Sequence, residues 1–536
     1  MTAESLSEGV LEGIGNARLV FGVGALPVAA AECLGDGRRY FSKSADSPGV
    51  AALMTNDRPT VELLLGAIEA GAQLISLPLP ARSADPVEYL RFVRRACEAQ
   101  GMNQIVARDD VAPLLEGTTL EVRPHSDLGS VPLAGPRESG FELIQYSSGS
   151  TDQPKAVKLT DRQLGANVAA IISAVQPEPG DKPVSWLPLS HDMGLIGMLL
   201  TSLASTRPSL ARQGDIILLD PVDFLRNPSA WVSAISDCAA TITAAPDFGY
   251  RLCAERDQRG ALDLSRLRCA IVGGEMIRRS TLTGFSDRFG TAGFRPTAFC
   301  PAYGMAELGL AATMTPMGSQ WREMTVATLP LAEQRLMPQG MDPAESREVT
   351  GLVSSGPAIS GYEVRCDAES GAVGPVSVRG ASIGVDGASG ASFADPDGWL
   401  MTGDLGAIAD GWLYVCGRGD DYVVARGRNI YAPAVEEAMG GIGAVRAGRT
   451  GVFGLPSGDW VVAAEPESSG RLAQSEVSAL IREIRKAALS VAACSPSQVV
   501  LVARGHLPFT PSGKLQRREL TRRYLKGELE MVNGGS

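Results

Sequence analysis

Apolar runs that suit buried strands alternate along this chain with runs of helical periodicity, a pattern typical of a layered α/β fold. Residues 61–72 have the spacing of an amphipathic helix, and Leu74–Leu79 follow as a candidate buried strand. Later predicted elements are strands at Val184–Leu189, Ile216–Leu219, Thr241–Ala245 and Cys269–Val272 and a helix at Ser229–Ala239. Because 536 residues are too many for one compact core, we expect at least two lobes.

After Gly417 the predicted strands and helices are those of a smaller unit. We therefore predict a large domain at residues 1–417 and a small one at 418–536. Predicted elements of the small unit are strands at Thr450–Phe453, Trp460–Ala464 and Val499–Val502 and a helix at Ser475–Val491. Residues 380–392, rich in Gly, Ala and Ser, form the most linker-like segment of the chain.

The sequence YSSGSTDQPK, from Tyr146 to Lys155, is a small-residue loop between the apolar run Phe141–Ile144 and a helical run after Thr160. Glycine and serine let backbone amides approach a polyanion closely, and hydroxyl groups donate further hydrogen bonds. Thr160 and Gln163 have the spacing of a helix capping box. The loop therefore predicts phosphate binding, although the composition also suits a plain turn and the P-loop spacing is absent.

Further motifs follow this loop in the chain. They are SWLPLSHDMGLIG at 185–197, AYGMAE at 302–307, MTGDLG at 401–406, GRGDDYVVARGRNIY at 417–431 and PFTPSGKLQR at 508–517. Together they resemble the adenylate-forming superfamily of acyl-CoA synthetases, fatty acyl-AMP ligases, luciferases and amino-acid adenylation domains. The resemblance implies an α/β fold, with a large N-terminal domain of layered α/β subdomains and a small mobile α+β C-terminal domain. It also implies that a carboxylate attacks the α-phosphorus of ATP.

The resemblance assigns roles in nucleotide binding, with ATP and Mg²⁺ as cofactors. The residues that match the family's phosphate-binding positions are Ser148, Gly149, Ser150, Thr151 and Lys155. Glu307 matches the magnesium carboxylate and Tyr303 the aromatic residue that lies against adenine. Asp404 matches the carboxylate that accepts the ribose hydroxyls, and Arg418 is placed for a second ribose contact. Without these motifs, Glu307 would suit a solvated helix, Tyr303 a core and Asp404 a turn.

Three further residues are implied to act in the reaction. Lys514 would bridge the substrate carboxylate and the α-phosphate, since an ammonium group on a flexible stem can follow developing charge. His191 would contact the substrate carboxylate or phosphate region, and Asp420 stands at the family's hinge position. The alternatives are an exposed lysine in a basic tail, a core histidine and a surface turn acid.

Several segments look most like fatty acyl-AMP ligases, above all RGRNIY at 426–431, and Ala306 stands where CoA synthetases usually carry Thr. Residues 324–349 are a candidate for the extra segment of those ligases, or an ordinary surface loop. The predicted acyl-binding residues are Met193, Phe248, Gly273, Gly274 and Met276. By resemblance, a fatty acid would pass to the phosphopantetheine thiol of an acyl carrier protein. The basic run Arg517–Lys526 is a candidate docking surface, or simply a solvated helix face.

Two alternative functions use much of the same sequence. An acyl-CoA synthetase would differ in its acceptor thiol, and a catalytically silent adenylate- or acyl-binding module would lack the reaction. Two departures from the family pattern weaken the assignment locally: GPVSVRG at 374–380, and the acidic Asp152 within the phosphate loop. They leave Glu307, Asp404, Arg418 and Lys514 unchanged.

The net charge of −11 argues against general nucleic-acid binding, which requires a basic surface. The nine cysteines contain no C-x-x-C pair and suggest reduced thiols. No signal peptide is recognisable in MTAESLSEGVLEG at the N-terminus, and no apolar run is long enough for a membrane span. We therefore expect a cytoplasmic location.

Overall fold

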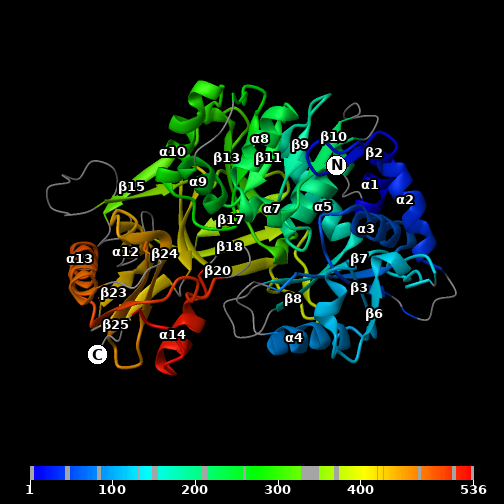
Figure 1. Ribbon diagram of the computed structural model, residues 1–536. Helices are drawn as coiled ribbons and strands as arrows, with labels where there is room; N and C mark the ends of the chain where they lie inside the picture. The colour runs from blue at the N-terminus through cyan, green and yellow to red at the C-terminus, as the bar shows by residue number, and fades with distance from the viewer. Residues whose placement is uncertain are drawn as a thin grey trace.

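The computed structural model describes residues 5–42, 47, 49–80, 86–130, 132–147, 155–206, 214–256, 261–327, 349–366, 373–418, 421–425, 428–468, 473–509 and 515–532. One large-lobe sheet has the strand order β14-β13-β12-β11-β9-β10-β1-β2 (Figure 1). Its strands are β1 (Arg18–Phe21), β2 (Val28–Ala29), β9 (Pro183–Ser185), β10 (Asp215–Leu218), β11 (Ile242–Ala245), β12 (Cys269–Val272), β13 (Phe299–Gly304) and β14 (Ala311–Met314). The pairs from β1 to β13 are parallel, and β2 and β14 join antiparallel at the two edges.

A second large-lobe sheet has the order β19-β8-β7-β4-β3-β5-β6. Its strands are β3 (Gly49–Leu53), β4 (Gln73–Leu77), β5 (Gln104–Ala107), β6 (Glu121–Pro124), β7 (Glu142–Ser147), β8 (Lys155–Thr160) and β19 (Val385–Asp386). Strands β3 and β4 are buried at every position, as expected for parallel strands covered on both faces.

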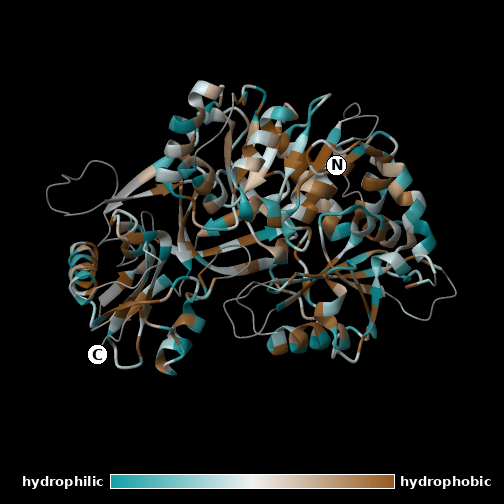
Figure 2. Cartoon of the chain, in the orientation of Figure 1, coloured by the Kyte–Doolittle hydropathy of each residue, from teal (hydrophilic) through white to brown (hydrophobic). Residues whose placement is uncertain are grey.

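Helices lie between the two sheets and share one hydrophobic core with both. These are α1 (Leu6–Ile14), α2 (Ala30–Gly37), α3 (Arg58–Ala70), α5 (Asp161–Val175), the π-helix η4 (Met193–Leu200) and α6 (Thr201–Ser205). The other face of the first sheet is covered by α7 (Pro221–Arg226), α8 (Ser229–Asp237), α9 (Asp247–Glu255) and α10 (Arg279–Phe289). The other face of the second sheet is covered by α4 (Pro86–Glu98). Figure 2 shows hydrophobic residues along the inner strands, whereas an outer helix such as α4 carries hydrophobic and hydrophilic residues in alternation.

A third sheet, of order β17-β18-β20-β21, leads from the large lobe toward the small one. Its strands are β17 (Tyr362–Cys366), β18 (Gly374–Gly380), β20 (Trp399–Ala409) and β21 (Trp412–Arg418), beside the antiparallel pair β15 (Glu323–Ala327) and β16 (Val349–Val353). The short helices of the lobe are η1 (Arg38–Tyr40), η2 (Ala112–Leu115), η3 (His125–Asp127), η5 (Gly290–Ala292), η6 (Pro296–Ala298) and η7 (Ala306–Leu308).

The small lobe carries the sheet β24-β25-β26 and the strand pair β22-β23. Its elements are β22 (Tyr422–Ala425), β23 (Arg428–Tyr431), α12 (Ala432–Met439), β24 (Val445–Gly454), β25 (Trp460–Pro466), α13 (Gln474–Ala492), β26 (Gln498–Leu501) and α14 (Arg517–Leu525). The predicted boundary at Gly417 stays a prediction. One hydrophobic core joins Trp412, Tyr414 and Cys416 of β21 to buried residues of the small lobe.

The predicted α/β class with a large and a small lobe is confirmed. The helix predicted at 61–72 begins earlier, at Arg58, because Asp57 accepts a hydrogen bond from the amide of Thr60. It ends before Gly71, whose φ of 67° suits a left-handed cap. The capping box of Thr160 and Gln163 at the start of α5 is also confirmed.

Two local predictions are wrong. The strand predicted at Val184–Leu189 ends at Ser185, because the chain leaves the sheet where the Trp186 ring stacks on Phe224 with centroids 3.6 Å apart. Residues 380–392 are no linker, since β19 within them pairs with β8. Gly384 also donates a backbone hydrogen bond of 2.9 Å to the carbonyl of Glu307.

Candidate active site

Most of the predicted site residues that the structure describes follow the carboxyl ends of strands in the first sheet. Tyr303 lies near the end of β13, and Glu307 follows in η7. Gly273 and Gly274 directly follow β12, and Phe248 lies in α9 just after β11. Open parallel sheets bind ligands at this edge, where the chain leaves the strands.

Tyr303, Asp404 and Arg418 form a cluster held by three strands. Asp404 in β20 pairs in register with Arg418 in β21. Arg418 Nε lies 3.2 Å from Asp404 Oδ1, and the Tyr303 hydroxyl donates a 2.6 Å hydrogen bond to Asp404 Oδ2. Burial and the adjacent carboxylate of Asp404 raise the pKa of Tyr303 well above its ordinary value. The hydroxyl therefore stays protonated and holds the carboxylate in place.

Lys155 and Glu307 form a second pair, between the start of β8 and η7. Lys155 Nζ lies 3.0 Å from Glu307 Oε1, and their side chains are 38% and 15% exposed. The ammonium group also lies 3.9 Å from the centroid of the Phe393 ring. The pair places one cation and one carboxylate at the end of the predicted phosphate loop.

Other predicted site residues lie outside the described residues. They are Ser148, Gly149, Ser150, Thr151, Asp420 and Lys514. The ends of the Lys514 segment are described: Phe509 pairs with Leu515 in an antiparallel bridge, and Gln516 donates a 2.9 Å backbone hydrogen bond to Pro508. These contacts bring the two ends of the segment together.

Arg517 and Asp421 join the predicted ribose contact to the small lobe, a connection that the sequence prediction missed. The Arg418 amide donates a 2.7 Å hydrogen bond to Asp421 Oδ2, and Arg517 Nη2 lies 3.0 Å from Asp421 Oδ1. Arg517 also donates to Glu436 of α12. The side chain of Arg517 is only 12% exposed. The prediction that Arg517 belongs to a surface docking run is therefore wrong.

The rest of that basic run is partly neutralised within α14. Arg522 and Arg523 both pair with Glu519 at 2.7 Å, and Arg522 also pairs with Glu528 at 2.9 Å. Because these carboxylates offset the guanidinium charges, α14 is a weaker candidate for binding an acidic partner than its sequence suggested.

The predicted acyl-binding residues surround the turn after β12. A Cβ added at Gly274, whose φ is 79°, would lie 3.2 Å from Met193 Cε. The Phe248 amide donates a 2.6 Å hydrogen bond to Glu275 Oε1. The hydroxyl of the small-lobe Tyr431 donates a 3.3 Å hydrogen bond to Met276 Sδ. Gly273 lies at the same turn.

His191 lies next to the start of η4, at the same edge of the sheet. Its Nδ1 is 3.5 Å from Asp192 Oδ1, and its side chain is 40% exposed. It is thus accessible to a ligand rather than a buried core histidine.

An acidic and basic cluster beside this turn was also missed from the sequence. Asp247 is fully buried and accepts from the Arg278 amide at 2.8 Å and from the Thr281 hydroxyl at 2.9 Å. Arg278 Nη1 completes the pair at 3.1 Å from Asp247 Oδ2. Burial, followed by the nearby Asp247 carboxylate, raises the pKa of Glu275 to about 7.

Within the described ranges, no group of three or more His, Cys, Asp or Glu side chains could hold a metal ion. A single carboxylate beside a phosphate loop suits Mg²⁺, which commonly takes one or two carboxylates together with substrate phosphates. Glu307 fits that requirement. In the part of the chain that the structure describes, no helix is long and apolar enough to cross a membrane.

Comparison with known proteins adds a family to this geometry. The family model described as "AMP-binding enzyme" matches residues 45–362. A Caulobacter vibrioides protein named "Putative acyl-CoA synthetase" is 34% identical over 91% of this chain and 87% of its own. The long-chain-fatty-acid–AMP ligase FadD32 of Mycolicibacterium smegmatis is 30% identical over 74% of this chain and 70% of its own. A solved structure from a study of fatty acyl-adenylate ligases of E. coli and L. pneumophila is 27% identical, with a TM-score of 0.86, and covers 98% of this chain and 99% of its own.

Proposed function

This chain belongs to the AMP-binding enzymes and is an AMP-forming ligase, and from that premise we propose that it is a fatty acyl-AMP ligase. In this proposal it activates an aliphatic carboxylic acid with ATP, releasing pyrophosphate. It then transfers the acyl group to the phosphopantetheine thiol of an acyl carrier protein.

The observation that carries the proposal is the set of charged groups that strands of three sheets bring together near the carboxyl end of β13. The Tyr303–Asp404–Arg418 cluster offers an aromatic ring, a carboxylate and a guanidinium group for a nucleoside. Glu307, four residues after Tyr303, and Lys155 offer groups for phosphates and a divalent cation. The acyl-binding turn at Gly273–Met276 follows the neighbouring strand, so an acid bound there would face the phosphate end.

Each residue then has a defined task. Asp404 accepts hydrogen bonds from the two ribose hydroxyls, while Tyr303 and Arg418 hold its carboxylate in position. Lys155 binds a phosphate oxygen after separating from Glu307, which then becomes available to the metal. When bound, Mg²⁺ neutralises phosphate charge and orients the pyrophosphate leaving group.

Lys514 and Asp420 complete the proposal. Lys514 stabilises the charge that develops between the carboxylate oxygen and the α-phosphate. Asp420 is the hinge about which the small lobe, residues 418–536, turns between adenylation and acyl transfer. The bridge of Phe509 to Leu515 would present Lys514 on a loop with fixed ends.

The acceptor is the point on which the relatives differ. FadD32 is named as a fatty-acid–AMP ligase, whereas the Caulobacter vibrioides relative carries the name of an acyl-CoA synthetase. Ala306, where CoA synthetases usually have Thr, and the RGRNIY motif favour the carrier protein. Transfer to CoA is therefore the second candidate.

The test begins with fatty-acid-dependent ATP/pyrophosphate exchange by the full chain. We expect exchange with aliphatic acids, and loss of at least about a hundredfold in Lys514→Ala, since single charge-stabilising donors contribute this much. Arg518→Ala, in the adjoining helix, is the matched control. If none of the tested acids supported exchange, the proposal would be refuted. Unchanged exchange in Lys514→Ala would remove that residue from the mechanism.

A second assay separates the two acceptors. Preformed acyl-AMP enzyme is offered either CoA or a phosphopantetheinylated carrier protein, and thioester formation is measured. Faster transfer to the carrier protein supports the proposal, and faster transfer to CoA selects the synthetase instead.

A further inference from the structure

A segment between β18 and β20, residues 382–393, lies against β8, the strand that starts at Lys155. We call this segment the strap. It contains β19, which pairs antiparallel with β8, and the Gly387 amide adds a 2.9 Å hydrogen bond to the Ala156 carbonyl. A Cβ added at Gly384 would lie only 2.7 Å from a backbone carbonyl oxygen of β8. A residue without a side chain therefore lets the strap approach β8 this closely.

The strap also holds η7, the short helix that carries Glu307. The Gly384 amide donates a 2.9 Å hydrogen bond to the Glu307 carbonyl, and the Ser382 hydroxyl donates to the Leu308 carbonyl. Ser382 has no exposed surface, so water does not compete for this second bond. Because one segment is bonded to both β8 and η7, it fixes the backbone positions from which Lys155 and Glu307 reach each other.

Phe393 ends the strap and lies beside the Lys155 ammonium group. The Phe393 amide donates a 3.2 Å hydrogen bond to the Gly384 carbonyl, and Ser392 pairs with Val385 in an antiparallel bridge. These contacts fold the strap back on itself and fix the ring, which also packs against two hydrophobic cores. Lys155 Nζ lies 3.9 Å from the ring centroid, within the range of a cation–π contact.

The ring and Glu307 offer Lys155 different interactions when phosphates bind. Lys155 Nζ lies 3.0 Å from Glu307 Oε1, and in the proposed function this ion pair separates as the carboxylate turns to the metal. The face of an aromatic ring attracts a cation without carrying a net negative charge. Phe393 can therefore retain the ammonium group and does not repel phosphates. The carboxylate of Asp386, also in the strap, is bonded instead to two backbone amides of the strap itself.

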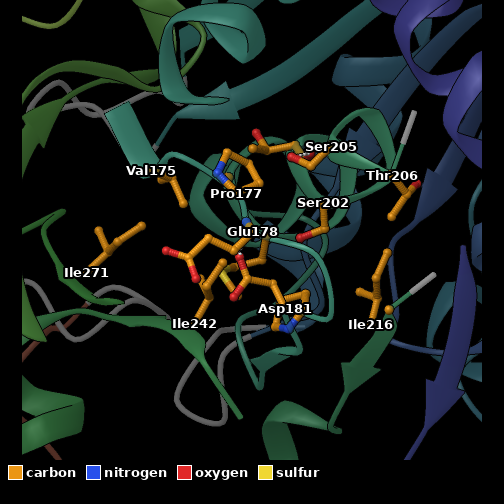
Figure 3. Close-up of a pocket in the computed structure, with 15 residues that line it drawn as sticks. Val175, Pro177, Glu178, Asp181, Ser202, Ser205, Thr206, Ile216, Ile242 and Ile271 are labelled. Atoms are coloured by element: carbon orange, nitrogen blue, oxygen red, sulfur yellow. Dashed lines mark hydrogen bonds between the residues drawn. The ribbon is translucent and has the colours of Figure 1, made fainter. Parts of the chain in front are cut away.

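The cavity shown in Figure 3 does not take part in these contacts. Pro183 and Ile242, which line it, are the first residues of β9 and β11, so the cavity lies at the amino ends of these strands. Glu307 instead follows the carboxyl end of β13 in the same sheet. A substitution in the strap therefore leaves the walls of the cavity unchanged.

We propose that Phe393 is a positioning residue for Lys155, whose ring holds the ammonium group at the phosphate site after Glu307 has left the ion pair. The strap sets the place of the ring and of η7, so it acts as a common support for both members of the pair. The inference rests on the proposed function and adds to it a residue outside the motifs that predicted the site.

The test compares Phe393→Leu with the wild type in the affinity of the full chain for ATP and for AMP, measured by isothermal titration calorimetry with Mg²⁺ present. In the proposal Lys155 binds the outer phosphates, which AMP lacks. We therefore expect the Kd for ATP to rise about fivefold in Phe393→Leu and the Kd for AMP to stay the same. A general loss of packing would weaken the binding of both nucleotides alike. Phe393→Tyr keeps the ring face and should bind ATP as the wild type does.

Two further variants test whether the effect acts through Lys155. Added to Lys155→Ala, Phe393→Leu should cause no further loss of ATP affinity, because the cation that the ring holds is gone. Trp399→Leu, at the start of β20, is the matched control. Its ring lies 4.0 Å from the Arg365 guanidinium and 4.8 Å from that of Arg379, and its loss should leave the Kd for ATP unchanged.

Three results would overturn the inference: folded Phe393→Leu binds ATP as the wild type does, weakens AMP binding as much as ATP binding, or still weakens ATP binding in the Lys155→Ala background. Each would leave the proposed function intact, which is refuted instead if none of the aliphatic acids supports ATP/pyrophosphate exchange. If Phe393→Leu does not fold, as judged by circular dichroism, Phe393→Met keeps an apolar side chain without a ring and is held to the same comparison.

Discussion

Two aspartate–arginine pairs at the active-site edge differ in how completely the carboxylate is enclosed. Asp247 has no exposed surface and accepts from the Arg278 amide, the Arg278 guanidinium and the Thr281 hydroxyl. The side chain of Asp404 is 13% exposed, and its partners come from separate strands. The two arginines are similarly exposed, at 31% and 29%. Enclosure of the carboxylate, rather than the ion pair itself, therefore separates a structural pair from one that can receive a ligand.

The largest expected effect is on folding, from Asp247→Ala. Removal of this buried carboxylate leaves the Arg278 amide, the Arg278 guanidinium and the Thr281 hydroxyl without their acceptor, and we expect a loss of about 3 kcal/mol in the free energy of unfolding. Denaturant unfolding measures the loss. Asp404→Ala should lose less in the same assay, because the Asp404 carboxylate is 13% exposed whereas that of Asp247 is fully enclosed. Equal losses in the two variants would show that enclosure of the carboxylate does not distinguish the two pairs.

The next effect is on activity, from Asp404→Ala. In the proposed mechanism this substitution removes two hydrogen bonds from the ribose to a charged acceptor, and we expect kcat/KM for ATP to fall about a hundredfold. Initial rates of pyrophosphate release at varied ATP concentration measure this fall. Normal ATP dependence in the folded variant would mean that Asp404, like Asp247, has only a structural role.

A smaller effect is expected from Arg418→Lys, which keeps the charge and loses the planar fork that faces Asp404. We expect kcat/KM for ATP to fall about fivefold, from less complete positioning of the carboxylate. Arg379→Lys, in an exposed pair with Glu363, serves as the control and should leave this value unchanged. A loss as large as that of Asp404→Ala would show that Arg418 binds the nucleotide more directly.

An effect of a different kind, on the pH dependence of stability, is expected from Glu275, near Asp247. Its pKa is about 7 in the folded protein, above the ordinary value of 4.5, so the folded state binds more protons between these values. Stability therefore falls as the pH rises through this window. We expect the wild type to lose stability relative to Glu275→Gln as the pH rises from 4.5 to 7, with no further relative change above 7. A stability difference between the two proteins that stays the same at every pH would contradict this expectation.

Local patterns were sufficient to predict much of the fold. The continuous apolar run at 269–272 is β12, and the predicted helix at Ser475–Val491 is α13, which extends one residue further at each end. Strand ends were harder to predict, because contacts from distant residues decide them. Trp186, for example, leaves the sheet to stack on Phe224, 38 positions away in the sequence.

The described residues of the candidate site were predicted where a short motif contains them. Tyr303 and Glu307 share one motif, Lys155 ends the predicted phosphate loop, and Asp404 and Arg418 each lie in a motif of their own. Asp247 and Arg278 lie 31 residues apart and meet because β11 and β12 are adjacent parallel strands. Nothing in the sequence around either residue distinguishes it from an ordinary surface charge. Arg517 was likewise placed at the surface, because neighbouring basic residues concealed its buried position.

The contact of Asp421 with both Arg418 and Arg517 has a consequence for product release. If the small lobe turns about Asp420, the ribose-side arginine and the segment after Lys514 cannot change position independently, because one carboxylate holds both. Occupancy of the nucleotide site would then bias the lobe toward one orientation. By thermodynamic reciprocity, that orientation would raise nucleotide affinity by the same factor. Departure of AMP and the return of the lobe would thus be coupled through a single aspartate.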